Sequence, residues 1–154
     1  MEREIGRLLV RKGWTLAVAE SCTGGLLGFR VTRVSGSSRY FAGGIVAYAN
    51  RIKTAWLGVP AAGLAREGAV SAGTARAMAR GVRERMGVEV GAAVTGIAGP
   101  GGGGPGKPVG LVFVALAYPG ACVARRFVFE GDRAAVRQAA AEAALRMLKE
   151  HLQR

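Results

Sequence analysis

The chain has 154 residues, half of them apolar, and a formal net charge of +12. This length suits one domain with a substantial core, which we place over residues 1–154. No apolar stretch is long enough to span a membrane, and the charged start of the chain lacks the apolar region of a signal peptide. The sequence therefore predicts a cytoplasmic protein with no membrane partner.

The positive charge favours an anionic ligand. Nucleic acid is not favoured as the partner, because the arginines are scattered and no aromatic residues are interleaved with them for base stacking. Cys22 and Cys122 are far apart and fit reduced thiols, and His151 is the only histidine. Without a Cys/His cluster, we expect no metal site.

Helical spacing and strand-like runs alternate through the first half of the chain. The predicted elements, in order, are a helix over residues 2–13, a strand over 14–20, a helix over 24–34, a loop over 35–38 and a strand over 40–48. Gly13 suits a helix C-terminal cap, and the adjacent Gly43 and Gly44 indicate a bulge or a close backbone approach.

The second half continues the alternation. The predicted elements are a short helix from Asn50 to near Gly58, a helix after Ser71, a strand over 88–95, a loop over 96–108, strands over 109–118 and 122–129, and a last helix after Asp132. Asn50, Ser71 and Asp132 are residue types that cap helices. The fold class expected is α/β, a single-domain three-layer sandwich with a mixed, mostly parallel sheet and helices on both faces.

The turn after the first strand is the strongest local feature. An apolar run ends at Glu20 and passes into Ser21, Cys22 and Thr23, followed by two glycines and a new helix. A strand, a tight turn and a helix lift a side chain to the edge of a sheet and aim free backbone N–H groups at a ligand. A hydroxyl here can also serve simply as a helix cap.

Ser21, Tyr48, Asn50 and Lys53 lie at strand ends or just after them, so neighbouring strands would bring them together at one edge of the sheet. A lysine of lowered pKa can act as the base for a serine nucleophile, whereas an arginine cannot. On spacing alone, an ordinary surface lysine and a core tyrosine are the preferred interpretation.

The glycine-rich stretch from Gly101 to Lys107 has the spacing of a phosphate-binding nucleotide loop. Pro108 stands where Ser or Thr should hold magnesium, and a strand rather than a helix follows. Nucleotide hydrolysis is therefore rejected. The loop can still form a wall or lid of the site, or it can be a solvent-exposed loop without a role in the site.

Seven motifs stand in one order along nearly the whole chain. They are Ala19–Gly25, Ser35–Ser38, Tyr48–Asn50 with Lys53, Gly68–Ser71, Thr95–Pro100, Lys107–Gly110 and Gly131–Arg133. This order resembles the CinA C-terminal domain family, whose enzymes are nicotinamide-nucleotide amidohydrolases. The resemblance implies hydrolysis of nicotinamide mononucleotide (NMN) to nicotinate mononucleotide and ammonia in pyridine-nucleotide salvage, with no cofactor. Longer members carry an N-terminal domain, so the resemblance implies a stand-alone form here, with a homo-oligomer as one option.

The resemblance also implies roles by position. Ser21 matches the nucleophile, Lys53 its base and Tyr48 a proton relay or orienting group. The expected substrate contacts are Thr23, Gly24, Gly25, Asn50, Thr95, Gly96 and Arg133. Backbone N–H groups from Thr23 to Gly25 are expected to stabilise the oxyanion. Two alternatives stay open: a regulatory module that binds a nucleotide without turnover, and a competence-related protein that binds nucleic acid.

Overall fold

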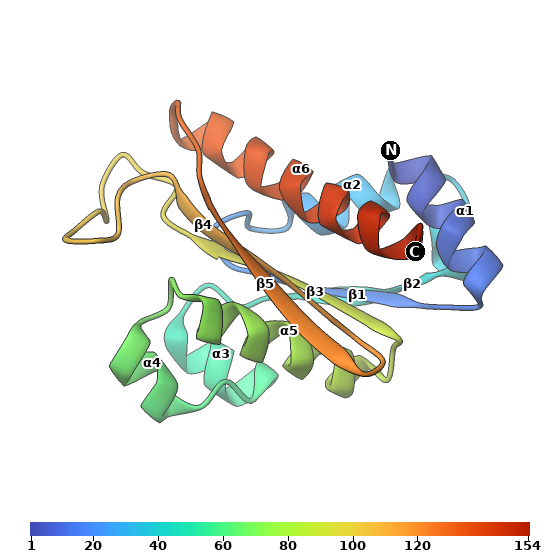
Figure 1. Cartoon of the computed structure of the whole chain (residues 1–154), viewed down its shortest axis with the longest axis horizontal. Helices are drawn as coiled ribbons and strands as arrows, with labels where there is room; N and C mark the ends of the chain where they lie inside the picture. Colours follow the sequence, from blue (N-terminus) through green and yellow to red (C-terminus); the bar gives the residue numbers. More distant parts are fainter.

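Five strands form one sheet in the order β2-β1-β3-β4-β5 (Figure 1). Their bounds are β1 Leu16–Glu20, β2 Phe41–Val46, β3 Val90–Gly96, β4 Leu111–Tyr118 and β5 Ala121–Val128. The computed structural model describes all 154 residues. β1 pairs in parallel with β2 and β3, while the β3–β4 and β4–β5 pairs are antiparallel. Only β4 runs against the other strands, which confirms the mixed sheet.

Helices cover both faces of this sheet, as predicted. Their bounds are α1 Glu2–Lys12, α2 Leu26–Thr32, α3 Asn50–Leu57, α4 Ala61–Glu67, α5 Ala72–Met86 and α6 Arg133–Leu152, with a short 3₁₀ turn η1 at Ser37–Arg39. Figure 1 shows α1, α2 and α6 on one face and α3, α4 and α5 on the other. None of the helices combines the length and apolar composition needed to cross a membrane.

The two faces are packed with side chains of different size. The face under α6 buries branched residues of β1, β3 and β4, whereas the face under α5 is rich in alanine. Small residues let α5 lie close to its neighbours: a Cβ on Gly81 would stand 1.8 Å from the carbonyl oxygen of Leu57, and one on Gly91 would stand 2.2 Å from that of Ala79. The predicted central strand, β3, is buried along almost its whole length.

The helix ends confirm some predicted caps and correct one. The Ser71 hydroxyl accepts from the Thr74 N–H at 3.0 Å, and the Asp132 carboxylate caps α6. The prediction that Asn50 caps α3 is wrong, because Ala49 occupies the N-cap position and Asn50 is already helical.

Two short elements were not predicted. α4 has only seven residues, between Pro60 and Gly68. A helix this short shows too little apolar periodicity in the sequence to be distinguished from a loop. η1 begins inside the stretch expected to be a loop.

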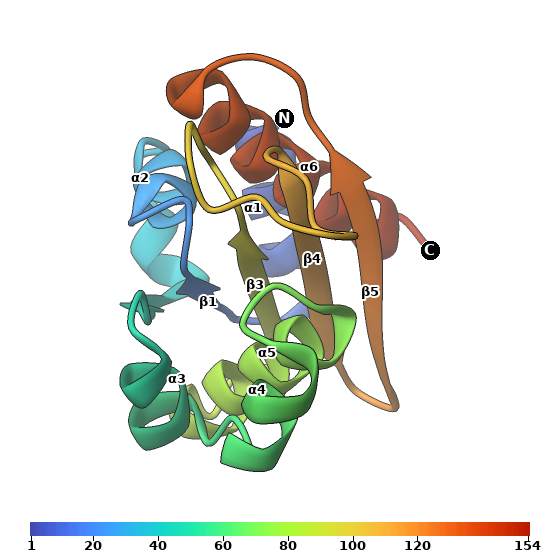
Figure 2. The ribbon, with the colours of Figure 1, turned by 90° about the vertical axis from the view of Figure 1, so that its left-hand side faces the viewer.

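β1 lies between the other two parallel strands, so the carboxyl ends of β1, β2 and β3 meet at one edge. The predicted bulge is present: Leu16 pairs with Phe41, and the next residue, Ala17, pairs with Gly43. A Cβ on Gly44 would lie 2.6 Å from a methyl of Val18, so glycine is required for this close approach. Figure 2 looks onto the edge where these strands end.

Candidate active site

A cavity of about 270 Å³ opens at the carboxyl ends of the parallel strands. Seven residues singled out from the sequence line it: Ser21, Tyr48, Asn50, Lys53, Thr95, Gly96 and Arg133. Thr23, Gly24 and Gly25 do not line it, because the chain turns away from the cavity after Cys22. The edge position expected from the strand ends is therefore confirmed, and most of the chosen residues meet there.

Ser21 and Lys53 are in direct contact. The Lys53 Nζ lies 3.2 Å from the Ser21 Oγ and 2.9 Å from the Tyr48 carbonyl oxygen. Lys53 is 1% exposed and forms no ion pair. Burial lowers the pKa of its ammonium group, and Cys22 would oppose that shift only as a thiolate. A buried lysine without a carboxylate can lose its proton, so its nitrogen can accept one from the Ser21 hydroxyl.

Cys22 lies beside Ser21 and also lines the cavity. Burial raises the pKa of its thiol to about 11. At neutral pH the group is therefore a thiol rather than the reactive thiolate. Of the two adjacent nucleophile types, Ser21 is the one in contact with a base.

Glu20 fixes the turn that carries Ser21. Its carboxylate is buried and accepts three backbone N–H groups, from Gly25 at 3.1 Å, Leu27 at 3.0 Å and Gly28 at 2.8 Å. It thereby takes up donors that the start of α2 would otherwise leave unpaired. The sequence analysis did not assign Glu20 a role, although a carboxylate that ends an otherwise apolar strand was a usable signal.

This arrangement corrects the expected oxyanion donors. The Gly24 N–H donates to the Ser21 carbonyl and the Gly25 N–H to Glu20, so neither is free. The N–H groups of Cys22 and Thr23 donate to no protein acceptor. Of these two residues only Cys22 lines the cavity, so its N–H is the free donor of the turn next to Ser21 in the cavity wall.

Arg133 closes one side of the cavity. Its guanidinium donates to the Tyr48 hydroxyl and to the Gly99 carbonyl, both at 2.8 Å. The Tyr48 side chain is thus directed toward Arg133, and only its backbone carbonyl contacts Lys53. Tyr48 therefore contacts Lys53 through its main chain, and the residue is 57% exposed.

The remaining wall comes from two segments distant in sequence. The buried Thr95 hydroxyl donates to the Ala69 carbonyl at 2.8 Å, which joins β3 to the segment before α5. The Lys107 Nζ donates to the Glu67 carbonyl and so ties the base of the glycine-rich loop to the end of α4. Residues Ile97 to Gly99, with Gly101 and Gly102, line the cavity, so this loop is a wall of the site.

Groups of three or more His, Cys, Asp or Glu side chains arranged to hold a metal ion do not occur in the structure. The cavity wall instead carries a serine hydroxyl, a buried amine, a free backbone N–H and a guanidinium.

Comparisons with known proteins place this geometry in a family. Residues 1–152 match the CinA C-terminal domain. A CinA-like protein of Geobacter sulfurreducens is 52% identical over 152 residues, which cover 99% of this chain and 37% of that protein. The chain therefore spans little more than a third of the curated relative's length.

Solved structures agree over the whole fold. The competence damage-inducible protein A of Klebsiella pneumoniae superposes with a TM-score of 0.95 at 35% identity, covering 99% of this chain and 94% of that one. A competence/damage inducible protein of Agrobacterium tumefaciens gives a TM-score of 0.93 at 39% identity, covering 99% and 95%. The chain belongs to the CinA C-terminal domain family.

Proposed function

We propose that the protein is an amidohydrolase that converts NMN to nicotinate mononucleotide and ammonia. The observation that carries this proposal is the 3.2 Å contact between the Ser21 hydroxyl and the buried, unpaired Lys53 amine. The choice of substrate rests on the resemblance to the CinA C-terminal domain family, whose enzymes are nicotinamide-nucleotide amidohydrolases.

In the acylation half, the Ser21 Oγ bonds to the carboxamide carbon while the neutral Lys53 Nζ takes the hydroxyl proton. The free N–H group of Cys22 donates to the oxygen of the tetrahedral intermediate. Its C–N bond then breaks, Lys53 returns the proton to the leaving nitrogen, and ammonia departs from an ester on Ser21. Water, deprotonated by Lys53, hydrolyses this ester and restores both groups.

Arg133 is the proposed phosphate ligand. It begins α6, whose first N–H groups and dipole favour an anion, and its planar fork matches phosphate oxygens. Its present bonds go to a tyrosine hydroxyl and a backbone carbonyl, both neutral acceptors that an anionic phosphate can replace.

The test is to incubate the purified protein with NMN and quantify ammonia and nicotinate mononucleotide together. The proposal predicts equal amounts of the two products, with rates that scale with protein concentration. NMN binding without either product would instead support a regulatory nucleotide-binding module.

A further inference from the structure

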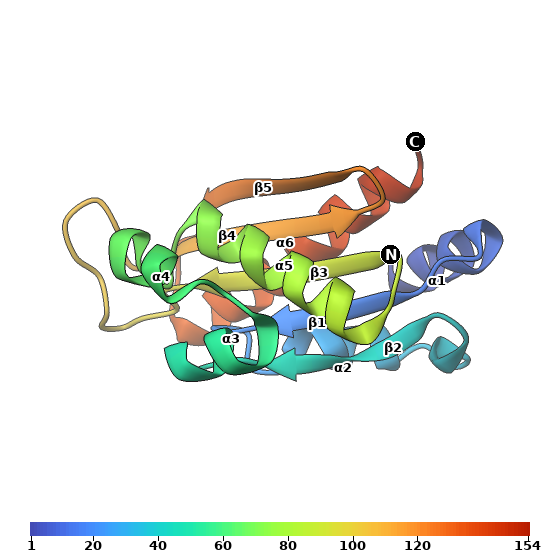
Figure 3. The same cartoon turned by 90° about the horizontal axis from the view of Figure 1, so that it is seen from below.

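A second cavity, also of about 270 Å³, lies between α1 and the segment that joins α2 to β2. Figure 3 shows α1 and the turn before β2 together at the end of the sheet where β1 and β2 begin, opposite the glycine-rich loop. The second cavity is therefore separate from the candidate active site, and its residues take no part in the proposed chemistry.

Four arginines line this cavity. Arg3, Arg7 and Arg11 recur every four residues along α1 and so form one stripe on that helix, and Arg39 faces them from the segment before β2. No acidic residue lines the cavity, and none of these four arginines takes part in any of the ion pairs of the protein. Four permanent charges thus surround one hollow without a counter-ion.

The acidic residues of α1 are engaged elsewhere. Glu2 pairs with Arg30 at 2.7 Å, and Glu4 pairs with Lys149 at 2.8 Å. Glu4 also lies near Arg7, which helps to lower the pKa of this carboxyl, but neither carboxylate lines the cavity. Like charges held close together repel one another, so an anion that enters the cavity would be stabilised by all four.

Uncharged donors without partners adjoin the same hollow. The backbone N–H groups of Ser35 and Gly36, both lining residues, donate to no protein acceptor. Tyr40, another lining residue, is only 4% exposed, and its hydroxyl has no hydrogen-bond partner. The Tyr40 ring packs so closely on Gly6 that a Cβ there would lie 2.7 Å from it. This hydroxyl is itself buried against α1, so Tyr40 lines the cavity without offering it a donor, and the free donors are the two backbone N–H groups.

We propose that this cavity binds a phosphate-bearing small molecule about the size of a mononucleotide. Guanidinium groups and free backbone N–H groups are the donors that recognise phosphate oxygens. Val10 and Val34 supply apolar wall for the rest of the molecule. The volume equals that of the candidate active site.

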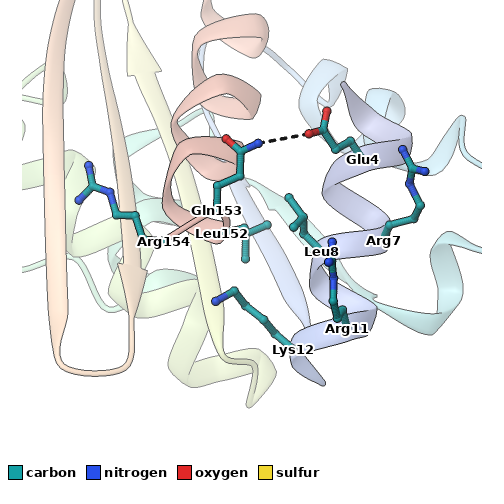
Figure 4. A pocket seen from close by; sticks show the side chains of 8 residues that line it. All are labelled: Glu4, Arg7, Leu8, Arg11, Lys12, Leu152, Gln153 and Arg154. Atoms are coloured by element: carbon teal, nitrogen blue, oxygen red, sulfur yellow. Dashed lines mark hydrogen bonds between the residues drawn. The ribbon is translucent and has the colours of Figure 1, made fainter.

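The groove on the other side of α1 is a weaker candidate. Figure 4 shows it between α1 and the end of α6, with Leu8 and Leu152 between the two helices and Arg7 on the side of α1 away from α6. It is larger, about 730 Å³, but Glu4 lies in it and accepts from Gln153 at 3.2 Å. A carboxylate at this position opposes an anion.

The test is calorimetric titration of pyrophosphate, AMP and adenosine into the Arg133→Ala protein, which removes the proposed phosphate ligand of the active site. Pyrophosphate and AMP are expected to bind saturably, and adenosine, which has no phosphate, at least tenfold more weakly. Adding Arg7→Gln with Arg39→Gln is expected to raise both dissociation constants at least tenfold. The matched control, Arg85→Gln with Arg126→Gln, removes two exposed arginines that form no ion pair and is expected to change them less than twofold.

Equal effects of the two arginine pairs, adenosine binding as tight as that of AMP, or binding of duplex DNA without pyrophosphate or AMP would each overturn the proposal. Binding is measured without turnover, so this result is independent of the proposed amidohydrolase activity.

Discussion

The two cavities at opposite ends of the sheet each have a volume of about 270 Å³, but only one of them has a lysine among its cations. That cavity is lined by Arg133 and by Lys53, which is 1% exposed and in contact with a serine hydroxyl. The other holds four arginines on exposed helix and turn positions. A buried lysine can exist as a neutral base, whereas an arginine keeps its proton and can only bind. In the two proposed sites, burial and side-chain type, more than the number of charges, distinguish proton transfer from anion binding.

The largest effect is expected from Ser21→Ala. Loss of a covalent nucleophile should lower the rate of NMN deamidation to below about a hundredth of wild type. The matched control is Cys22→Ala, which alters the neighbouring side chain of the same turn. Because its thiol has a pKa of about 11, this variant should keep most of the activity. The reverse ranking would assign the chemistry to Cys22.

Lys53→Arg tests this difference most directly, because it places an arginine, the cation of the second cavity, at the position of the buried lysine. The rate should fall almost as far as in Lys53→Met, because arginine keeps the charge but cannot accept the Ser21 proton. Lys53→Met keeps a similar stem without the amine, and thermal melting of both variants checks the fold. If Lys53→Arg retained most of the rate, Lys53 would be an electrostatic contact and another group would be the base.

Arg133→Ala should act on substrate binding. The KM for NMN should rise by an amount equivalent to about 1–3 kcal/mol, the range for hydrogen bonds to charged groups. The dephosphorylated riboside has no phosphate to lose, so its kcat/KM should change little. Equal losses on nucleotide and riboside would show that Arg133 is not the phosphate ligand.

The smallest effect is expected from a chelator. EDTA should leave the deamidation rate unchanged, because the candidate site offers a lysine, hydroxyls and backbone groups rather than a cluster of metal-ligating side chains. A loss that a specific divalent ion restores would contradict the Ser–Lys chemistry.

The sequence predicted the order of strands and long helices because those elements bury regular apolar patterns. It also predicted that Ser21 and Lys53 would meet, since both follow neighbouring parallel strands. Local patterns could not show that Glu20 takes the Gly25 N–H, because that bond depends on how the carboxylate packs under α2. The turn after β1 thus has different free donors from those expected.

Tertiary placement also explains why the arginine cavity was not predicted. Arg39 lies 28 residues after Arg11 in the sequence, so the charge pattern read as scattered. The fold brings the segment before β2 against α1, and only then do the four arginines share one hollow. α4 was missed for a related reason, because seven residues give too little periodicity to register.

The central claim, that Lys53 is a base because it is buried, can be measured directly as the pKa of its ε-amine. Lysine-labelled protein can be titrated by NMR, with the Lys53 signal identified by its absence from Lys53→Arg. Burial lowers the pKa of this group, so the signal should titrate below the ordinary value of 10.5, and kcat/KM for NMN should rise with pH through the same midpoint. A Lys53 signal that titrates at 10.5 or above, in protein that still deamidates NMN, would contradict the account.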